Sequence, residues 1–504
     1  MAGRCLGGLC LGAVLVAPAW SQQAPISRDQ PWADEVLYFV LIDRFADGDA
    51  RNNIRVDRRN PGGWHGGDFA GLTRQLDELQ DLGITALWIN PVQRQQPRGM
   101  PAQAPGKTGV GEFQHEPFHG YWIDDFETLD PHFGSLDELK TLVAEAHRRG
   151  IKVLLDVVYN HTGYTSTLGS RRTASGESWV RIGEGNCEVA PVTCAVGGLP
   201  DLKTEIPEVR DYLLGANIAL AKASGVDGFR LDTYKHLASE FWAEHRQRTR
   251  AELGPRFFLL AEVWGGSAQG LDAIFERDEV DSGFDFSFKG SCEGWVSGRG
   301  RTVAYAAYLR NRHQVRPGYV LAHYLSSHDE PMALGDLDGN RARFRVCAAL
   351  QMTSLGMPVI YYGEEVARDG HEWPLNRNDM PWGERDILPG KGVARDESMR
   401  EFYKALIRIR KERAALRRGD YTMLTQPPDA TLAFARRDAT SGDQVVVLAN
   451  RDDKPASADV AVPSGWTAAG ARDALSGERV STAGGRIKAE MAPTSVRILV
   501  PSAE

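Results

Sequence analysis

The sequence predicts an α/β fold: a (β/α)8 TIM barrel with an inserted domain after the third strand and an antiparallel β-sandwich at the C-terminus. Three observations predict this fold. Short apolar runs alternate with amphipathic stretches from about residue 35 to 410. One connection in that region is unusually long and polar. Near Arg418 the pattern changes to short alternating strands. The expected segments are a signal peptide (1–21), a first barrel part (22–159), an inserted domain (160–204), a second barrel part (205–415) and the C-terminal β-sandwich (416–504).

The barrel elements are predicted from apolar runs and helical periodicity. The eight expected strands are residues 36–42, 86–89, 152–158, 228–232, 257–262, 283–288, 320–326 and 358–362. The expected helices are residues 69–82, 136–149, 207–223, 238–252, 341–354 and 397–412. A doubly wound open sheet is the alternative. The lack of a Gly-rich phosphate loop after the first predicted strand counts against that alternative.

The inserted domain and the C-terminal domain are predicted from changes in composition. Residues 160–204 are rich in Gly, Thr and Ser and show little helical periodicity. A βα connection of this length is usually functional. At the C-terminus, residues 432–435, 444–448 and 496–500 are short apolar runs typical of strands in a small β-sandwich.

Composition and charge exclude several classes of protein. Hydrophobic residues make up 42% and charged residues 25% of the 504 residues, which is typical of a globular protein. The formal net charge is −8 and no long Lys/Arg run occurs, so nucleic acid is not an expected partner. No apolar run reaches 18 residues, so no membrane span is expected. We expect a monomer.

The N-terminus has the order of a secretory signal peptide. Arg4 precedes an apolar stretch over residues 6–17, and small residues around Ala19 and Ser21 offer a cleavage site. A buried first helix is the alternative, and Pro18 argues against it. We therefore expect a secreted or periplasmic protein.

Four cysteines follow the predicted signal peptide. Cys187 and Cys194 are close enough in sequence to form a disulfide within the inserted domain in an oxidising compartment. Cys347 lies in an apolar helical stretch and is expected to be a buried thiol. Sequence spacing alone does not decide whether Cys292 is a free thiol or part of a disulfide.

Polar side chains gather at the predicted strand ends, where chemistry takes place in this type of barrel. They are His161 after the third strand, Arg230 and Asp232 at the fourth, Glu262 at the fifth, and His328 and Asp329 after the seventh. Glycoside hydrolysis needs one carboxylate as nucleophile or base and a second carboxyl group as acid. Arg230 is two residues before Asp232, so both point to one face and the cation favours ionised Asp232. Glu262, on the adjacent strand, is the expected acid.

At these residues the chain resembles the α-amylase family of glycoside hydrolases (family 13). Four stretches carry the resemblance in the family's order, together with His119–Trp122, which is similar to a segment whose Tyr stacks on the sugar at the cleavage point. The four stretches are Asp156–His161, Gly228–His236, Ala261–Trp264 and Ser327–Asp329. The family's mechanism retains the anomeric configuration through a covalent glycosyl-enzyme.

The resemblance implies a role for each matching residue. It implies Asp232 as nucleophile, Glu262 as acid/base and Asp329 as the carboxylate that holds the distorted sugar. The residues that it implies in substrate binding are Tyr121, Trp122, His161, Arg230, Lys235, His236, Trp264, His328 and Arg377. Many members carry an Asp-Pro pair and then an Arg after the eighth strand. Here Arg377 has a counterpart, but Trp373 stands in the place of Asp.

Two calcium ions are expected. The first site, at the junction of the inserted domain and the barrel, is implied by the resemblance and comprises Asn160, Asp201 and the carbonyl of His236. The second lies in an N-terminal loop that is rich in oxygen ligands and similar to a calcium loop of cyclodextrin glycosyltransferases. Its expected ligands are Asp47, Asp49, Asn52, Asn53, Gly66 and Asp68.

The resemblance leaves three functions open. The first is cleavage of internal α-1,4 bonds in starch-like α-glucans and maltooligosaccharides, which the Lys235–His236 pair favours. The alternative is cyclodextrin or pullulan hydrolysis or glucan transfer, because Trp264 resembles the cyclomaltodextrinase and neopullulanase group. A catalytically inactive binding subunit is the third, and the presence of Asp232, Glu262 and Asp329 argues against it.

Overall fold

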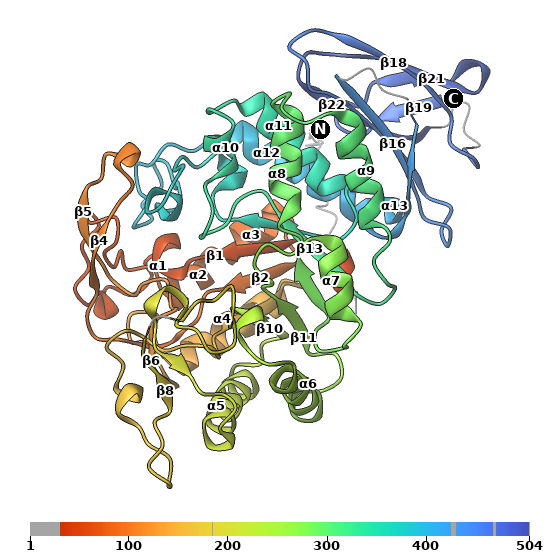
Figure 1. Ribbon diagram of the computed structural model, residues 1–504. Coiled ribbons are helices and arrows are strands. Elements are labelled where there is room, and N and C mark those ends of the chain that lie inside the picture. Colours follow the sequence, from red (N-terminus) through yellow and green to blue (C-terminus); the bar gives the residue numbers. More distant parts are fainter. Residues whose placement is uncertain (1–30, 184, 425–429, 467–469, 503–504) are drawn as a thin grey trace, which may run out of the picture.

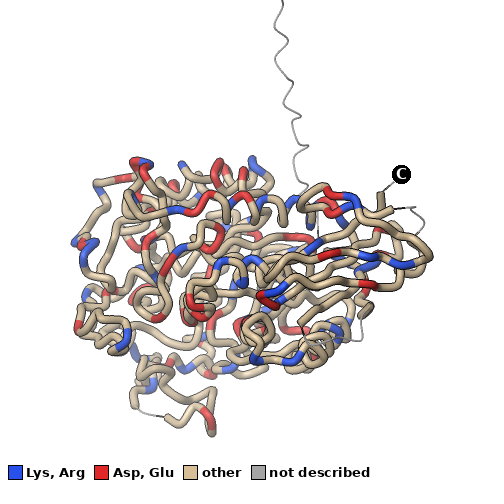
Figure 2. Tube along the Cα trace, turned by 90° about the horizontal axis from the view of Figure 1, so that it is seen from above, with Lys and Arg blue, Asp and Glu red and all other residues tan. Residues whose placement is uncertain are grey.

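The computed structural model describes residues 31–183, 185–424, 430–466 and 470–502. The predicted signal peptide (1–21) lies outside these residues. None of the described helices is both long enough and apolar enough to cross a membrane. Figure 1 shows the barrel with its surrounding helices and, beside it, the C-terminal sheet. In Figure 2 residues of both charge signs are interspersed over both parts.

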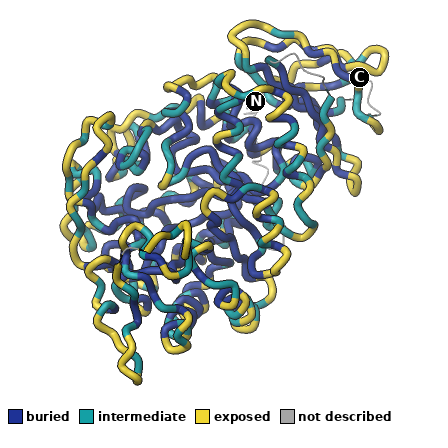
Figure 3. The backbone as a smooth tube through the Cα atoms, in the orientation of Figure 1, coloured by how far each residue is buried: buried dark blue, intermediate teal, exposed yellow. Residues whose placement is uncertain are grey.

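A closed barrel of eight parallel strands forms the centre of the larger part, as predicted. In chain order the strands are β1 (Leu37–Val40), β2 (Ala86–Ile89), β7 (Lys152–Val157), β10 (Gly228–Leu231), β11 (Phe258–Ala261), β12 (Ser282–Phe284), β13 (Val320–Tyr324) and β14 (Met357–Tyr361). The strands are almost wholly buried (Figure 3). Helices cover their outer face, and side chains fill the interior of such a barrel.

Helices surround the barrel, and some of them begin or end at recognisable capping residues. They are α1 (Ile42–Phe45), α2 (Phe69–Arg74), α3 (Leu76–Leu82), α4 (Leu136–Arg148), α5 (Pro207–Ser224), α6 (Ser239–Leu253), α7 (Ala268–Phe275), α8 (Ser287–Val296), α9 (Thr302–Arg312), α10 (Ala333–Asp336), α11 (Arg341–Thr353), α12 (Glu397–Glu412) and α13 (Ala414–Arg418). A capping box of Ser135 and Glu138 starts α4. Pro207 occupies the first turn of α5, and Gly225 ends that helix with a φ of 78°.

Two predicted elements differ in detail. The helix predicted over residues 69–82 is divided at Gln75 into α2 and α3. The strand predicted over residues 283–288 ends at Phe284, and α8 begins at Ser287. The carboxylate of Asp285 accepts a hydrogen bond from the Ser287 backbone N–H, and this local turn ends the strand.

An excursion between β2 and α4 was not predicted. It comprises β3 (Gln93–Gln95) paired with β6 (Ile123–Leu129), and a hairpin of β4 (Met100–Gln103) with β5 (Glu112–His115). This excursion brings His119, Tyr121 and Trp122 to the open end of the barrel, and Figure 1 shows its hairpin at the molecule's edge.

The inserted domain follows β7 and contains one small sheet of β8 (Val180–Arg181) and β9 (Asp201–Leu202). Cys187 and Cys194 form a disulfide in it, with Cα atoms 5.2 Å apart. The C-terminal part is an antiparallel sheet in the order β15-β16-β17-β22-β19-β20-β21-β18. Its strands are β15 (Asp420–Met423), β16 (Thr431–Arg437), β17 (Gln444–Asn450), β18 (Ala456–Ala461), β19 (Gly470–Asp473), β20 (Arg479–Ser481), β21 (Arg486–Met491) and β22 (Ser495–Ser502).

Candidate active site

A cavity of about 560 Å³ opens at the carboxyl ends of the barrel strands. It is lined by eleven of the predicted site residues: Tyr121, Trp122, His161, Asp232, Lys235, His236, Glu262, Trp264, His328, Asp329 and Arg377. Arg230, the remaining predicted substrate residue, is buried next to Asp232 and Glu262. The structure therefore gathers all the predicted catalytic and substrate-binding residues at one cavity.

Strand register places the two central carboxylates side by side. In the parallel pair of β10 and β11, Leu231 lies opposite Ala261, and each strand is followed directly by an acid, Asp232 or Glu262. The guanidinium of Arg230 contacts both acids, with Nη1 2.7 Å from Asp232 Oδ1 and Nη2 2.8 Å from Glu262 Oε1. One buried cation thus fixes the position of both carboxylates.

The environment of Glu262 favours its protonated form. Burial raises the pKa of Glu262 to about 8, the neighbouring Asp232 and Asp329 carboxylates add to the increase, and Arg230 opposes it. Oε2 of Glu262 accepts a hydrogen bond of 2.9 Å from the Thr233 backbone N–H. A carboxyl group that keeps its proton near neutral pH is suited to act as a general acid.

Asp156, in β7, completes the buried charge cluster, although it was not among the predicted site residues. It lies opposite Arg230 in the strand pair, and its Oδ1 is 3.0 Å from Arg230 Nη1. Its Oδ2 accepts hydrogen bonds from the Tyr121 hydroxyl and the Trp88 indole, at 2.7 and 3.1 Å. Burial raises the pKa of Asp156 to about 7 despite the charge of Arg230. The signal that could have found it is its position opposite Arg230 on the adjacent strand.

Asp329 lies across the cavity, held by two side chains. Arg377 donates a hydrogen bond of 3.1 Å to Oδ1, and His328 Nε2 lies 3.1 Å from Oδ2. Burial acts to raise the pKa of Asp329, but the adjacent His328 and Arg377 outweigh it and lower the pKa. Burial lowers the pKa of His328 to about 3, so its imidazole is neutral at ordinary pH.

Aromatic rings form the floor of the cavity. Tyr121 stacks on His328, with ring centroids 5.2 Å apart and planes inclined by 13°. His161 Nε2 donates to the Tyr121 carbonyl at 3.2 Å, and the Tyr121 N–H donates to His119 Nδ1 at 3.1 Å. The face of Tyr121 is therefore held rigidly beside Asp156 and Arg230.

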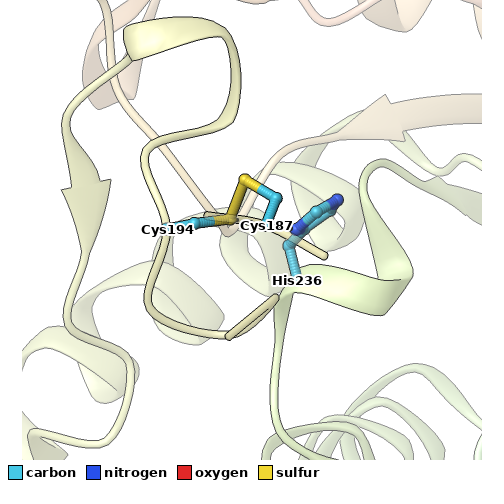
Figure 4. A group of neighbouring side chains, drawn as sticks. All are labelled: Cys187, Cys194 and His236. Atoms are coloured by element: carbon cyan, nitrogen blue, oxygen red, sulfur yellow. Dashed lines mark hydrogen bonds between the residues drawn. A yellow bond between two sulfur atoms is a disulfide. The ribbon is translucent and has the colours of Figure 1, made fainter. Parts of the chain in front are cut away.

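The disulfide loop of the inserted domain packs against the segment that follows Asp232. Figure 4 shows the Cys187–Cys194 disulfide beside the imidazole of His236. Nδ1 of His236 lies 2.9 Å from the Pro191 carbonyl oxygen and 3.7 Å from Cys194 Sγ. The inserted domain thus forms one wall of the cavity and holds His236 in place.

The N-terminal loop site fits calcium. Its Asn52 Oδ1 and Asn53 Oδ1 are buried oxygens that have no hydrogen-bond partner among the described residues. A Cβ at Gly66 would collide with Asn53 Oδ1, so glycine keeps this space open. Asp68 accepts hydrogen bonds from backbone N–H groups and from Asn52 Nδ2, and it caps α2. Two predicted ligands already have a cationic partner, since Asp49 pairs with the exposed Arg51 and Asp47 with Arg58.

The predicted junction site contains both an ion pair and a buried oxygen without a partner among the described residues. Arg181 Nη1 lies 2.6 Å from Asp201 Oδ2, and Arg181 also pairs with Glu205. The Asp201 carboxylate is therefore paired with a side-chain cation, as Asp47 is with Arg58 at the loop site. Asn160 Oδ1 is buried without a partner among the described residues, as Asn52 Oδ1 and Asn53 Oδ1 are, and calcium at the junction stays a prediction. Burial raises the pKa of Asp201 to about 7.

The fold and the site define a barrel enzyme that carries paired carboxyl groups and a stacking platform at its open end. The profile described as the α-amylase catalytic domain matches residues 39–181 and 192–393, and that of the maltogenic amylase C-terminal domain matches residues 421–498. The chain belongs to the α-amylase family of glycoside hydrolases.

Similar proteins include two curated enzymes and a solved structure. Neopullulanase 2 of Thermoactinomyces vulgaris is 30% identical over 510 residues, covering 95% of this chain and 80% of that protein. A cyclomaltodextrinase of a Bacillus species is 30% identical over 455 residues, covering 85% of this chain and 75% of that protein. The crystal structure of an Anoxybacillus α-amylase superposes with a TM-score of 0.82 at 28% identity, covering 94% of this chain and 100% of that chain.

Proposed function

We propose that the protein is a retaining glycosidase that hydrolyses α-1,4-glucosidic bonds in cyclodextrins, pullulan and maltooligosaccharides. The observation that carries this proposal is the pair of buried carboxyl groups, Asp232 and Glu262, bridged by Arg230 beside the Tyr121 platform. The similarity to a neopullulanase and a cyclomaltodextrinase supports the choice of substrates.

The mechanism follows from the positions of these groups. The Asp232 carboxylate attacks the anomeric carbon while protonated Glu262 gives its proton to the glycosidic oxygen, and the C–O bond breaks. The glycosyl-enzyme ester is then hydrolysed by a water molecule, whose proton returns to the Glu262 carboxylate. Asp329, fixed by Arg377 and His328, holds hydroxyl groups of the distorted sugar.

Calcium at the N-terminal loop site has a structural role in this proposal. The ion would link the loop after α1 to the start of α2 through its positive charge. Its ligands would be Asp47, Asn52, Asn53, Asp68 and the Gly66 carbonyl. Within the chain itself, Arg58 donates to Asp47 at 2.8 Å and helps to close the same loop.

The test of the function is product analysis on β-cyclodextrin, pullulan and soluble starch side by side, with Asp232→Asn and Glu262→Gln as matched inactive controls. We expect cyclodextrin and pullulan to be cleaved with efficiency at least comparable to starch. Exclusive cleavage of starch would instead favour an α-amylase that cleaves internal bonds, a second candidate that the similarity to the Anoxybacillus α-amylase supports. No turnover on any α-glucan would refute the proposal.

The proposed setting of the enzyme is export by cleavage after residue 19 or 21, followed by action as a monomer in the periplasm or outside the cell. The disulfide of the inserted domain supports export, because disulfides persist in oxidising compartments. The N-terminal sequence of the mature protein and its mass in solution test these two points.

A further inference from the structure

Two cysteines outside the inserted domain lie against each other in the core. Cys292 is in the middle of α8 and Cys347 is in the middle of α11, and both are fully buried free thiols. Their Sγ atoms are 2.8 Å apart. The two helices follow the adjacent strands β12 and β13, and Figure 1 shows them next to each other. The fold therefore brings two thiols that are 55 residues apart in sequence into direct contact.

The separation of the two sulfur atoms is intermediate between a contact and a bond. Nonbonded carbon atoms pack at about 3.5–4.0 Å, and sulfur is larger than carbon. The two sulfur atoms of a disulfide are about 2.05 Å apart. An approach of about 0.75 Å would therefore bring the Sγ atoms of Cys292 and Cys347 to bonding distance.

Other uses of a thiol pair do not fit this position. A structural zinc site takes about four ligands, and among the described residues no group of three or more possible metal ligands includes Cys292 or Cys347. A catalytic thiol must be accessible to its substrate, whereas both of these residues are 0% exposed. The remaining choice is between a hydrogen-bonded pair of thiols and a disulfide, and the redox state of the surroundings decides it.

We propose that Cys292 and Cys347 form a second disulfide in an oxidising compartment, and that this bond ties α8 to α11 and stabilises the barrel. The loop that the bond closes contains β13 and Asp329. The inference rests on the proposed export of the protein, but it does not depend on the proposed hydrolysis of α-glucans.

The oxidant is a disulfide of another protein or of a small thiol compound. The thiolate of one cysteine attacks a sulfur atom of that disulfide, forms a mixed disulfide and expels one thiol. The thiolate of the second cysteine then attacks the mixed disulfide and expels the other thiol. Two electrons and two protons pass from the cysteine pair to the oxidant, so one disulfide forms while another is reduced to two thiols.

Burial determines when this exchange takes place. Burial and the contact with Cys292 raise the pKa of Cys347, so the reactive thiolate is scarce in the folded protein. An external disulfide does not reach a sulfur atom in a residue that is fully buried. The bond therefore forms during folding, before α8 and α11 pack together, and the packed core afterwards protects it from reductants.

The test is peptide mapping of the full chain made in an oxidising compartment, with free thiols alkylated in denaturant and no reduction step. We expect a cross-linked pair of peptides that contains Cys292 and Cys347. Protein made in a reducing cytoplasm is the control and should carry both residues as alkylated thiols. Two alkylated thiols in folded protein from the oxidising compartment would overturn the proposal. Because the mapping requires neither the natural signal peptide nor activity, that result would leave the proposed hydrolysis untouched.

A second measurement compares stability in a variant that lacks the disulfide of the inserted domain. In the background of Cys187→Ser with Cys194→Ser, protein from the oxidising compartment should melt about 2–5 °C higher than protein from the reducing one. The physical reason is that a bond across 55 residues restricts the unfolded chain. Adding Cys347→Ala to the same background should abolish the difference. Equal melting temperatures of the two preparations without Cys347→Ala would overturn the stabilising role of the bond.

Discussion

Replacing Arg230 by Met should destabilise the fold in a strongly pH-dependent way. Arg230 is 1% exposed and contacts three buried carboxyl groups, those of Asp156, Asp232 and Glu262, at 3.0, 2.7 and 2.8 Å. Methionine retains much of the side-chain volume but leaves these groups without their cation. Removing one partner of a buried ion pair costs about 3–5 kcal/mol.

The sign of the pH dependence follows from Asp156 and Glu262. Their pKa values in the folded protein, about 7 and about 8, lie above those of the unfolded chain. Their contribution to stability is therefore fully present below about pH 4 and is lost as the pH rises through about 7 to 8. Arg230 limits this loss because it lowers both pKa values. Without Arg230 both pKa values rise further, and each added unit costs about 1.4 kcal/mol at alkaline pH.

The assay is urea unfolding of the Arg230→Met variant at about pH 5 and about pH 9, on either side of these titrations. We expect the loss of unfolding free energy to be larger at the higher pH by about 1.4 kcal/mol or more. Arg368→Met is the control, since Arg368 is equally buried but donates to the backbone carbonyls of Tyr362, Asn376 and Asn378. An equal loss at both pH values for Arg230→Met would refute the charge argument and leave only lost packing.

Three further predictions concern the acid, the disulfide and the calcium loop. The kcat/KM for α-glucan should fall as the pH rises through about 8, because Glu262 must be protonated to act as acid. If kcat/KM instead falls with a midpoint more than about one pH unit below 8, Glu262 is not the acid. Replacing Cys187 and Cys194 by Ser should lower the unfolding free energy by no more than about 3 kcal/mol, since the loop that the disulfide closes is short. It should also raise KM, because the disulfide loop contacts His236 in the cavity wall. An unchanged KM in steady-state kinetics would count against a role of the disulfide in holding that wall. Chelation should lower the melting temperature of the unchanged protein but not that of Asn53→Ala, which lacks one of the expected ligand oxygens. An ion at 100 times its dissociation constant adds about 2.7 kcal/mol to the unfolding free energy. Metal analysis that finds no calcium would disprove the site.

The barrel and the candidate acids at its open end could be predicted from the sequence alone. Strand and helix periodicities are local properties of the chain, so they predict the order of elements without knowledge of distant contacts. The acids Asp232 and Glu262 directly follow such strands, and parallel strands bring their carboxyl ends to one face. Local periodicity therefore suffices to place these two carboxyl groups at one end of the barrel.

Features that depend on contacts between distant segments could not be predicted from the sequence. Arg181 meets Asp201 through the pairing of β8 and β9, and the sequence did not predict this ion pair at the junction of the inserted domain. Trp373 meets the β4–β5 hairpin across more than two hundred residues of chain, and this contact places its ring in the wall of the cavity. The pattern of apolar residues along the chain does not predict such contacts, because they depend on how loops of the completed barrel fold over its open end.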